Sequence, residues 1–271
     1  MPELPEVETL RAELDVALRH AVIDEVVLRR NDLRFPMPKH LPQVMRGQAV
    51  RCVARRAKYL LIEGEREAML AHLGMSGKMV VHEQMPKTFG KHDHVVFSFR
   101  DGRALVFTDP RRFGMLDLLP KQGVHKLLAG IGPEPLESGF DAVYLSKALE
   151  KRRGPIKTVI MDQRLVAGVG NIYASEALFL ARISPSREAG SLTKKEATAL
   201  LEAIQAVLRA AIASGGSTLR DYVRSGGEKG WFQHEFKVYD REGEACVHCG
   251  EALRHAVMGG RATYYCETCQ R

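Results

Sequence analysis

Long apolar runs, a targeting segment and internal repeats are all missing from this sequence. Hydrophobic residues make up 45% of the 271 positions, yet no stretch approaches the roughly 18 uninterrupted apolar residues of a membrane-spanning helix. The amino terminus reads Met-Pro-Glu-Leu-Pro-Glu and lacks the basic and then apolar run of a signal peptide. We therefore expect a folded cytoplasmic protein with a sizeable core and room for two domains.

Cysteine is nearly absent before the last 26 residues. Cys52 stands alone in an apolar, strand-like stretch, and we predict that it lies in the core. The other four form two pairs, each with a two-residue spacer and with 16 residues between the pairs: Cys246, Cys249, Cys266 and Cys269. Zinc prefers four thiolates in a tetrahedron, and this spacing presents them. Two disulfides are the alternative, but a cytosolic chain disfavours them. We predict one structural zinc ion.

Positive charge is in modest excess, with 40 lysines and arginines against 33 acidic residues. Such an excess is compatible with an ordinary solvated surface. The basic residues are clustered, however, at Arg51, Arg55, Arg56 and Lys58, at Arg111 and Arg112, and at Lys151, Arg152, Arg153 and Lys157. Clusters that meet on one face would bind phosphate groups, so the pattern favours a nucleic-acid partner.

The first 130 residues have the pattern of an antiparallel β domain with a leading helix. Residues 4–18 are predicted to be a helix, with Pro5 in its first turn and Leu10, Leu14 and Leu18 on one face. Strand-like runs follow at residues 22–28, 49–62, 68–72 and 78–81. Residues 94–108 predict two strands around Asp101-Gly102, a dipeptide suited to a type I′ hairpin turn.

After the glycine- and proline-rich segment at residues 130–135, the pattern becomes helical. Thr193 and Glu196 predict a capping box, followed by an apolar stripe that Gly215-Gly216 ends. Two shorter helices are expected at residues 156–162 and 172–181, joined across residues 168–171 in a helix-turn-helix outline. Residues 214–235 are rich in glycine, serine and charge, and we predict that much of this segment is a mobile loop.

The amino terminus could supply a nucleophile. A small second residue such as Pro2 permits removal of the initiator methionine, which exposes a secondary amine. An α-amino group titrates at about 7.7 to 8, and the positive end of the following helix disfavours its charged form. A secondary amine that attacks a sugar C1′ forms an iminium, and Glu3 alongside could move a proton. In isolation, a proline and an acid that merely open a helix explain the same residues.

Motifs along nearly the whole chain resemble those of the formamidopyrimidine-DNA glycosylases, the bacterial enzymes that remove oxidised purines. The resemblance begins with Met1-Pro2-Glu3-Leu4-Pro5-Glu6-Val7-Glu8-Thr9. It continues in residues 55–60 (RRAKYL), 72–77 (HLGMSG), 91–94 (KHDH), 108–114 (TDPRRFG), 168–176 (GVGNIYASE) and 261–266 (RATYYC). In the sister family, endonuclease VIII, glycine usually follows the catalytic glutamate in place of Leu4.

The resemblance implies a multidomain α+β fold. Residues 1–132 would form the catalytic β-sandwich with its leading helix, residues 133–236 a helical domain with a helix-two-turns-helix motif, and residues 237–271 the zinc-finger β-hairpin. The implied partner is double-stranded DNA that contains oxidised bases or abasic sites, bound by a monomer.

The resemblance also assigns catalytic residues. Pro2 matches the nucleophile, Glu3 the proton donor, Lys58 a lysine used in β-elimination and Arg261 an arginine used in δ-elimination. A phosphate contact is an alternative for Lys58, and solvation is the ordinary state of a surface arginine such as Arg261.

Six further residues match positions that contact DNA. His92, Arg111, Arg152 and Asn171 match residues that bind the DNA, although many relatives carry lysine at the position of Arg152. Helix capping alone is the alternative for Asn171. Met75 and Phe113, together with Arg111, match the side chains that fill the gap left by a flipped base. Ordinary core packing is the alternative for Met75 and Phe113.

We therefore expect a bifunctional enzyme that excises 8-oxoguanine or formamidopyrimidines through Pro2 and then cleaves the abasic site by β,δ-elimination. Two alternatives remain at this point. One is an endonuclease VIII-like enzyme that acts on oxidised pyrimidines. The other is a non-catalytic DNA-binding protein with a helix-turn-helix and a zinc finger, which gives no reason for Pro2, Glu3 and Lys58 to occur together.

Overall fold

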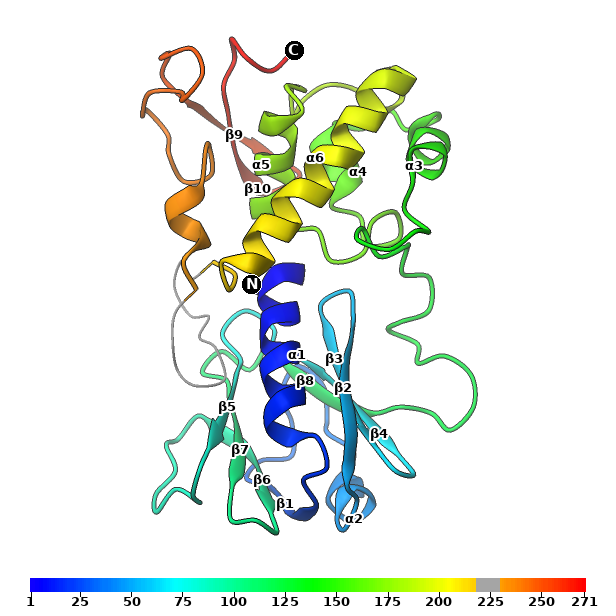
Figure 1. Cartoon of the computed structure of the whole chain (residues 1–271), viewed down its shortest axis with the longest axis vertical. Coiled ribbons are helices and arrows are strands. Elements are labelled where there is room, and N and C mark those ends of the chain that lie inside the picture. Colours follow the sequence, from blue (N-terminus) through cyan, green and yellow to red (C-terminus); the bar gives the residue numbers. More distant parts are fainter. Residues whose placement is uncertain (218–229) are drawn as a thin grey trace. The chain divides into compact units, whose positions relative to one another are not determined.

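Two compact units make up the chain in the computed structural model, which describes residues 1–217 and 230–271 (Figure 1). The first unit is Met1–Ala129 with the described part of Ser214–Gln233, and the second is Gly130–Ala213 with His234–Arg271. Among the helices in the described ranges, none combines the length and the apolar composition needed to cross a bilayer.

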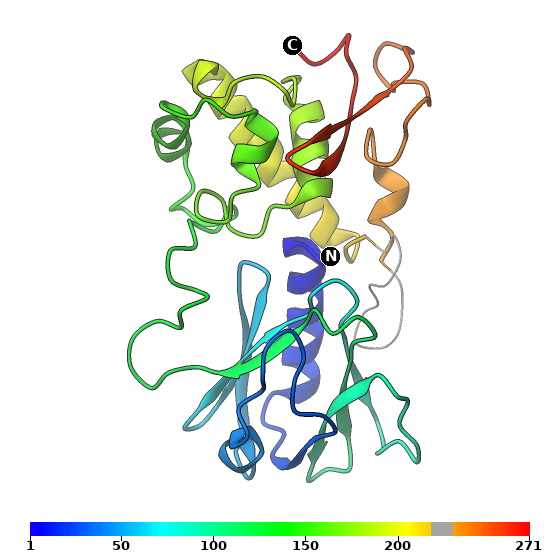
Figure 2. The same cartoon turned by 180° about the vertical axis from the view of Figure 1, so that it is seen from behind.

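The first unit consists of two four-stranded antiparallel sheets and a long helix. One sheet has the strand order β1-β6-β7-β5 and the other β2-β3-β4-β8. The elements are α1 (Leu4–Leu18), β1 (Ile23–Leu28), α2 (Leu41–Met45), β2 (Val50–Arg56), β3 (Tyr59–Gly64), β4 (Ala68–His72), β5 (Lys78–His82), β6 (Asp93–Phe99), β7 (Ala104–Thr108) and β8 (Met115–Leu118). Figures 1 and 2 show α1 running alongside both sheets. The predicted antiparallel sandwich with a leading helix is confirmed.

Helix α1 closes one side of the core of this unit. Leu10, Leu14 and Leu18 are fully buried and pack in one apolar cluster with residues from both sheets. The helix begins with a capping box, in which the Glu3 side chain accepts from the backbone of Glu6 and the Glu6 side chain accepts from the backbone of Glu3. The helix therefore fixes the conformation of the first residues of the chain.

The β6–β7 turn differs from the prediction. A type I′ turn needs positive φ at both central residues. Gly102 has φ +93°, but Asp101 is not among the residues with positive φ. The amide of Gly102 donates to the carbonyl of Phe99, and the amide of Phe99 donates to the carbonyl of Arg103. This is the pattern of a type I turn followed by a left-handed glycine, so the type I′ prediction was wrong.

The second unit is helical. Its elements are α3 (Ala142–Leu149), α4 (Ile156–Ile160), α5 (Asn171–Leu180), η1 (Ala189–Ser191), α6 (Lys194–Ala213), η2 (Phe232–Glu235), β9 (Arg254–Met258) and β10 (Arg261–Tyr265), of which η2 begins in the first unit. Helix α5 is buried from Ile172 to Phe179. Helix α6 packs against it through an apolar face that includes Leu200, Ile204 and Leu208.

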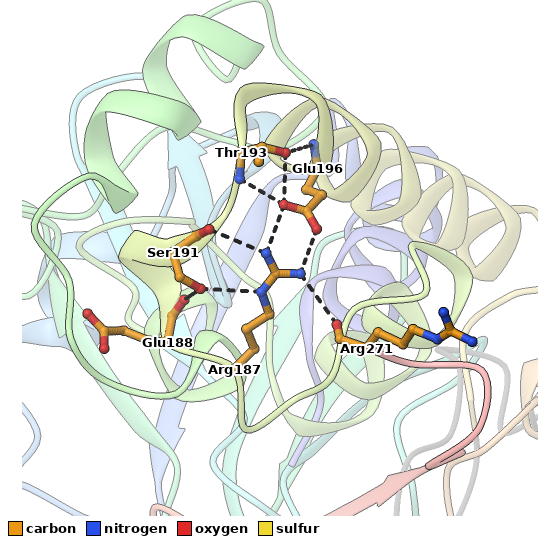
Figure 3. A network of polar contacts seen from close by, with 6 residues as sticks. All are labelled: Arg187, Glu188, Ser191, Thr193, Glu196 and Arg271. Carbon is orange, nitrogen blue, oxygen red and sulfur yellow. Dashed lines mark hydrogen bonds and ion pairs between the residues drawn. The ribbon is translucent and has the colours of Figure 1, made fainter.

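A polar network holds the start of α6 (Figure 3). Thr193 and Glu196 form the predicted capping box: the backbone N–H of Thr193 donates to Glu196 Oε2 at 2.8 Å, and the backbone N–H of Glu196 donates to Thr193 Oγ1 at 3.3 Å. The Arg187 guanidinium binds both oxygens of Glu196 at 2.5 and 2.9 Å. The hydrogen bond from Arg187 is the main cause that lowers the pKa of Glu196 to about 2. Arg187 also donates to the carbonyl of Arg271, so the network joins α6 to the last residue of the chain.

A buried carboxylate joins α5 to the segment that leads into the β9–β10 hairpin. Glu176 accepts hydrogen bonds from the backbone N–H groups of Lys237, Val238 and Tyr239 at 2.8 to 3.0 Å. Burial raises the pKa of Glu176, and the three backbone hydrogen bonds oppose that rise. The helix and the hairpin therefore form one packed body within this unit.

The predicted mobile loop at residues 214–235 lies largely outside the described residues, because 218–229 are not among them. The described ends are ordered by specific contacts. Gly215 and Gly216 have φ of +74° and +77° after the end of α6, as expected for a helix stop. Phe232 is buried within η2.

Candidate functional site

The amino-terminal segment is held by one carboxylate of α1, that of Glu6. Pro2 and Glu3 are buried, whereas Met1 is 49% exposed. The backbone N–H of Glu3 donates to Glu6 Oε2 at 2.8 Å. The other oxygen of Glu6 accepts from the backbone N–H and the hydroxyl of Ser217 at 2.8 and 3.0 Å. Pro2 and Glu3 thus sit at the positive end of the helix in a fixed conformation.

Lys58 lies in the two-residue turn between β2 and β3. The sequence predicted a single strand-like run over residues 49–62, but the chain reverses at Ala57-Lys58, where Arg56 pairs with Tyr59. Ala57 has φ +51° and is 1% exposed, and Lys58 is 7% exposed. A lysine buried to this extent is not an ordinary solvated surface cation.

His72 lies near enough to both the amino terminus and Lys58 for their positive charges to lower its pKa. The pKa of His72 is lowered to about 4, first by burial and then by the positive charges of Lys58, Arg34 and the amino terminus. Its Nδ1 accepts a hydrogen bond from the backbone N–H of Gly74 at 2.9 Å, so that nitrogen carries no proton. The sequence reasoning assigned no role to His72. Its place in the HLGMSG motif was the available signal.

Met75 and Phe113 lie at the tips of two loops that are fastened together. Met75 is 37% and Phe113 45% exposed, so neither is a core residue. Buried Asp109 accepts from the Ser76 hydroxyl in one loop at 2.6 Å and from the Gly114 backbone N–H in the other at 2.8 Å. A Cβ on Gly74 would collide with the carbonyl carbon of Phe113, so only glycine permits this approach.

Two further predicted DNA contacts flank the same loops. The Arg111 guanidinium lies over the Phe113 ring, 4.8 Å from its centroid. The carbonyl of His92 accepts from the backbone N–H of Asp109 at 3.0 Å. The first unit therefore brings His92, Arg111, Met75 and Phe113 together around Asp109.

Asn171 does not cap α5. The N-cap residue is Gly170, and no side-chain hydrogen bond caps the helix. Asn171 is instead the first helical residue, and its Nδ2 donates to the carbonyl of Ala262 at 2.9 Å. The capping alternative was therefore wrong. The Asn171 Oδ1 atom is buried without a hydrogen-bond partner among the described residues.

Several residues of the predicted basic clusters are buried or paired with acidic side chains. Lys157 is fully buried, and its Nζ donates to the Ala262 carbonyl and to Thr263 Oγ1, both at 2.8 Å, so its assignment to a phosphate-binding surface was wrong. Arg51 pairs with Glu63 at 2.6 Å and Arg55 with Glu8 at 2.8 Å.

Other predicted residues are placed as follows. Arg152 and Arg261 are exposed, the latter at the start of β10 and next to Ala262. Cys52 is only partly buried on β2 and outside the core cluster, so its core prediction was wrong. Burial nevertheless raises the pKa of its thiol.

The four paired cysteines form a tetrathiolate cluster. Their sulfur atoms all lie within 4.8 Å of one another, and Cys246–Cys269 and Cys249–Cys266 are 3.9 and 3.5 Å apart. A tetrahedral zinc ion with Zn–S bonds of about 2.3 Å separates its sulfurs by about 3.8 Å. All four are free thiols, which contradicts the disulfide alternative. The cluster fits one structural zinc ion.

Comparisons with known proteins cover the whole chain. Three family models match: the formamidopyrimidine-DNA glycosylase N-terminal domain over residues 1–116, the formamidopyrimidine-DNA glycosylase H2TH domain over 131–223, and the zinc finger found in FPG and IleRS over 243–271. Formamidopyrimidine-DNA glycosylases of Stenotrophomonas maltophilia and Thiobacillus denitrificans are 47% and 48% identical over the full length of both chains. The chain belongs to the formamidopyrimidine-DNA glycosylase family.

Solved structures of this family share the fold. MutM (FPG) from Thermus thermophilus superposes with a TM-score of 0.89 at 40% identity, over 99% of this chain and 98% of that one. MutM in complex with DNA containing carbocyclic 8-oxo-G gives 0.90 at 35% identity over the whole of both chains. Lactococcus lactis Fpg with DNA containing an abasic site gives 0.89 at 33% identity over 99% of each.

Proposed function

We propose a residue assignment for the activity of this chain as a bifunctional DNA glycosylase and abasic-site lyase of base excision repair. The protein removes oxidised purines from duplex DNA and then cleaves the resulting abasic site. The observations that carry the assignment are the burial of Pro2, Glu3 and Lys58, and the fact that the charges of the amino terminus and of Lys58 both lower the pKa of His72.

Pro2 and Glu3 carry the glycosylase step. Once Met1 is removed, the nitrogen of Pro2 attacks C1′ of the damaged nucleotide, and the base leaves with the electron pair of its bond to C1′. The nitrogen then loses its proton, and the sugar ring opens as Glu3 protonates the ring oxygen. An iminium between Pro2 and C1′ remains, which is the electron sink for the next step. The position of Pro2 at the start of α1 favours a neutral and therefore nucleophilic amine.

Lys58 and Arg261 carry the strand cleavage. In β-elimination the proton on C2′ is removed, with Lys58 as the proton-transferring group, and the bond from C3′ to its phosphate oxygen breaks. In δ-elimination the proton on C4′ is removed and the bond from C5′ to its phosphate oxygen breaks, while the Arg261 guanidinium hydrogen-bonds the departing phosphate. Hydrolysis of the iminium then frees Pro2.

The remaining residues hold and distort the DNA. Met75, Arg111 and Phe113 fill the space left by the flipped nucleotide, which is supported by the exposure of both apolar side chains on loops fixed by Asp109. His92, Arg152 and Asn171 bind the DNA backbone.

The zinc site has a structural role. Zinc held by Cys246, Cys249, Cys266 and Cys269 fixes the hairpin that carries Arg261. We further propose that the enzyme acts as a monomer, and that it works in the bacterial cytoplasm at the nucleoid, because its substrate is chromosomal DNA.

A panel of lesion duplexes tests the substrate class. The protein should cleave duplexes with 8-oxoguanine or a formamidopyrimidine much faster than matched duplexes with an oxidised pyrimidine. Equal or greater cleavage of the pyrimidine duplexes would favour the endonuclease VIII-like activity. Tight DNA binding without cleavage of any duplex would favour a non-catalytic protein.

A further inference from the structure

The turn that carries Lys58 has an unusual backbone. Ala57, which precedes Lys58, has φ +51° and is almost fully buried. Residues other than glycine and asparagine rarely adopt this left-handed conformation, because their Cβ crowds the neighbouring carbonyl oxygen. Such a conformation persists only where surrounding contacts impose it.

Arg55 supplies one of these contacts and connects the turn to α1. Its Nη1 donates to the carbonyl of Ala57 at 2.9 Å, and its Nε donates to Glu8 Oε2 at 2.8 Å. The second oxygen of Glu8 accepts from Arg11 Nε at 2.8 Å, so the carboxylate is held from both sides. The Arg55 side chain is 11% exposed. Its guanidinium is therefore a largely buried bridge between the helix and the turn and not a solvated surface cation.

The bridge joins the two elements that supply the chemistry. Helix α1 begins at the Pro2-Glu3 terminus, and the β2–β3 turn presents Lys58. Catalytic groups on separate elements need their relative position fixed to within about 0.5 Å. We propose that Arg55, oriented by Glu8, is a positioning residue that holds Lys58 in register with the amine of Pro2. The inference rests on the roles proposed above for Pro2 and Lys58.

Arg103 provides a matched control within the same unit. Its guanidinium likewise binds a carboxylate, that of Asp101, at 2.6 Å, and it also donates to the carbonyl of Ala17 in α1. Like Arg55, it ties a hairpin turn to this helix. Its own turn, however, carries none of the proposed catalytic or DNA-contacting residues. Loss of Arg103 should therefore lower stability as loss of Arg55 does, without slowing strand cleavage.

The experiment measures cleavage of a preformed abasic site under single-turnover conditions with saturating enzyme. Arg55→Met should slow strand cleavage by at least about tenfold, since small misplacements of a catalytic group have effects of this size or larger. Its dissociation constant for the uncleaved duplex should stay within about twofold of the wild-type value, since the Arg55 guanidinium is engaged by Glu8 and the Ala57 carbonyl. Arg103→Met should lower the melting temperature by a similar amount and leave the rate unchanged. Adding Ala57→Gly to Arg55→Met should recover part of the rate, because glycine adopts positive φ without the bridge.

A double-mutant cycle decides whether Arg55 acts through Lys58. In a Lys58→Met background, the residual cleavage rate should be insensitive to Arg55→Met. The inference would be overturned if Arg55→Met slowed cleavage by the same factor with Lys58 present and in the Lys58→Met background. It would also be overturned if Arg103→Met slowed cleavage as much as Arg55→Met. Neither result would affect the role of Lys58. If Lys58→Met alone left cleavage unchanged, the assignment of Lys58 would itself fail, and the inference with it.

Discussion

Met75 and Phe113 are apolar side chains presented to solvent by a rigid support. Their neighbours Leu73 and Met115 are 2% and 4% exposed, so burial changes sharply within two residues along each loop. Asp109 holds the two loops through Ser76 and Gly114. Side chains that must enter a distorted duplex benefit from such a fixed support, because less freedom is lost on binding.

Truncating Phe113 should separate a void-filling role from a structural one. Because Phe113 is 45% exposed, Phe113→Ala should lower the free energy of unfolding by less than about 1 kcal/mol, well below the roughly 3–5 kcal/mol of a buried phenylalanine. Excision of 8-oxoguanine from a duplex should slow sharply, since flipping becomes costlier. Cleavage of a preformed abasic site should be affected less.

Leu73→Ala is the matched control for a loss of core packing. It should cost about 2–5 kcal/mol and reduce both activities in parallel as folded protein is lost. If Phe113→Ala gave the same pattern in melting temperature and in both assays, the void-filling role would be rejected.

His72 should make stability depend on pH in a defined window. Its pKa is about 4 in the folded protein against 6.5 for an ordinary histidine. Between these pH values, His72 binds a proton more readily in the unfolded chain than in the folded protein. The contribution of neutral His72 to stability is therefore lost as pH falls from about 6.5 towards 4. The loss at pH 5 should be roughly 1 to 2 kcal/mol. Unperturbed carboxylates titrate near or below the lower end of this window.

Thermal unfolding of His72→Gln tests this expectation. The drop in melting temperature between pH 7 and pH 5 should be a few degrees smaller in the variant than in the wild type. An identical drop in both proteins would show that His72 titrates normally or is not linked to folding.

Among the elements, those with strong local signals were predicted well. Residues 4–18 form α1 with the predicted apolar face, and Thr193 with Glu196 caps α6 as expected. Both signals are local, because a cap and an apolar period are contained in a few neighbouring residues. The paired cysteines likewise specify their cluster by spacing alone.

Predictions failed where contacts between residues far apart in the sequence determine the position of a side chain or a turn. Lys157 lies in a basic run, but its ammonium group is buried and donates to the carbonyl of Ala262, which is more than 100 residues away in the sequence. The same carbonyl binds Asn171, which removes that side chain from a capping role. The reversal at Ala57-Lys58 was missed because alanine and lysine are not typical turn residues and tertiary contacts impose the turn. The roles of the catalytic and DNA-contacting residues stay predictions.

Removal of zinc should affect the hairpin more than the rest of the fold. The protein should contain one zinc ion per chain, and Cys249→Ser should weaken DNA binding by disordering the segment that carries Arg261. The apolar core between the two sheets does not involve the cysteine cluster, so most secondary structure should persist. Elemental analysis, circular dichroism and DNA titration check these outcomes, and active protein without zinc would contradict the structural role.

At the scale of the whole molecule, the two eliminations are assigned to different residues. Lys58 is proposed to act in β-elimination and Arg261 in δ-elimination. The two eliminations should therefore be separable. Arg261→Ala should leave base excision and β-elimination largely intact while reducing the δ-elimination product. Denaturing gels that resolve the two cleavage products measure this ratio, and an equal loss of both products would contradict the division.

The central claim is that the amine of Pro2 forms the covalent intermediate. Borohydride reduction during reaction with an 8-oxoguanine duplex should trap a protein–DNA adduct, and peptide mapping should place the DNA on Pro2 in protein whose intact mass shows that Met1 has been removed. Acetylation of the terminal amine, or retention of Met1, should abolish trapping. An adduct that maps to Lys58, or that still forms after acetylation of the terminus, would contradict the account.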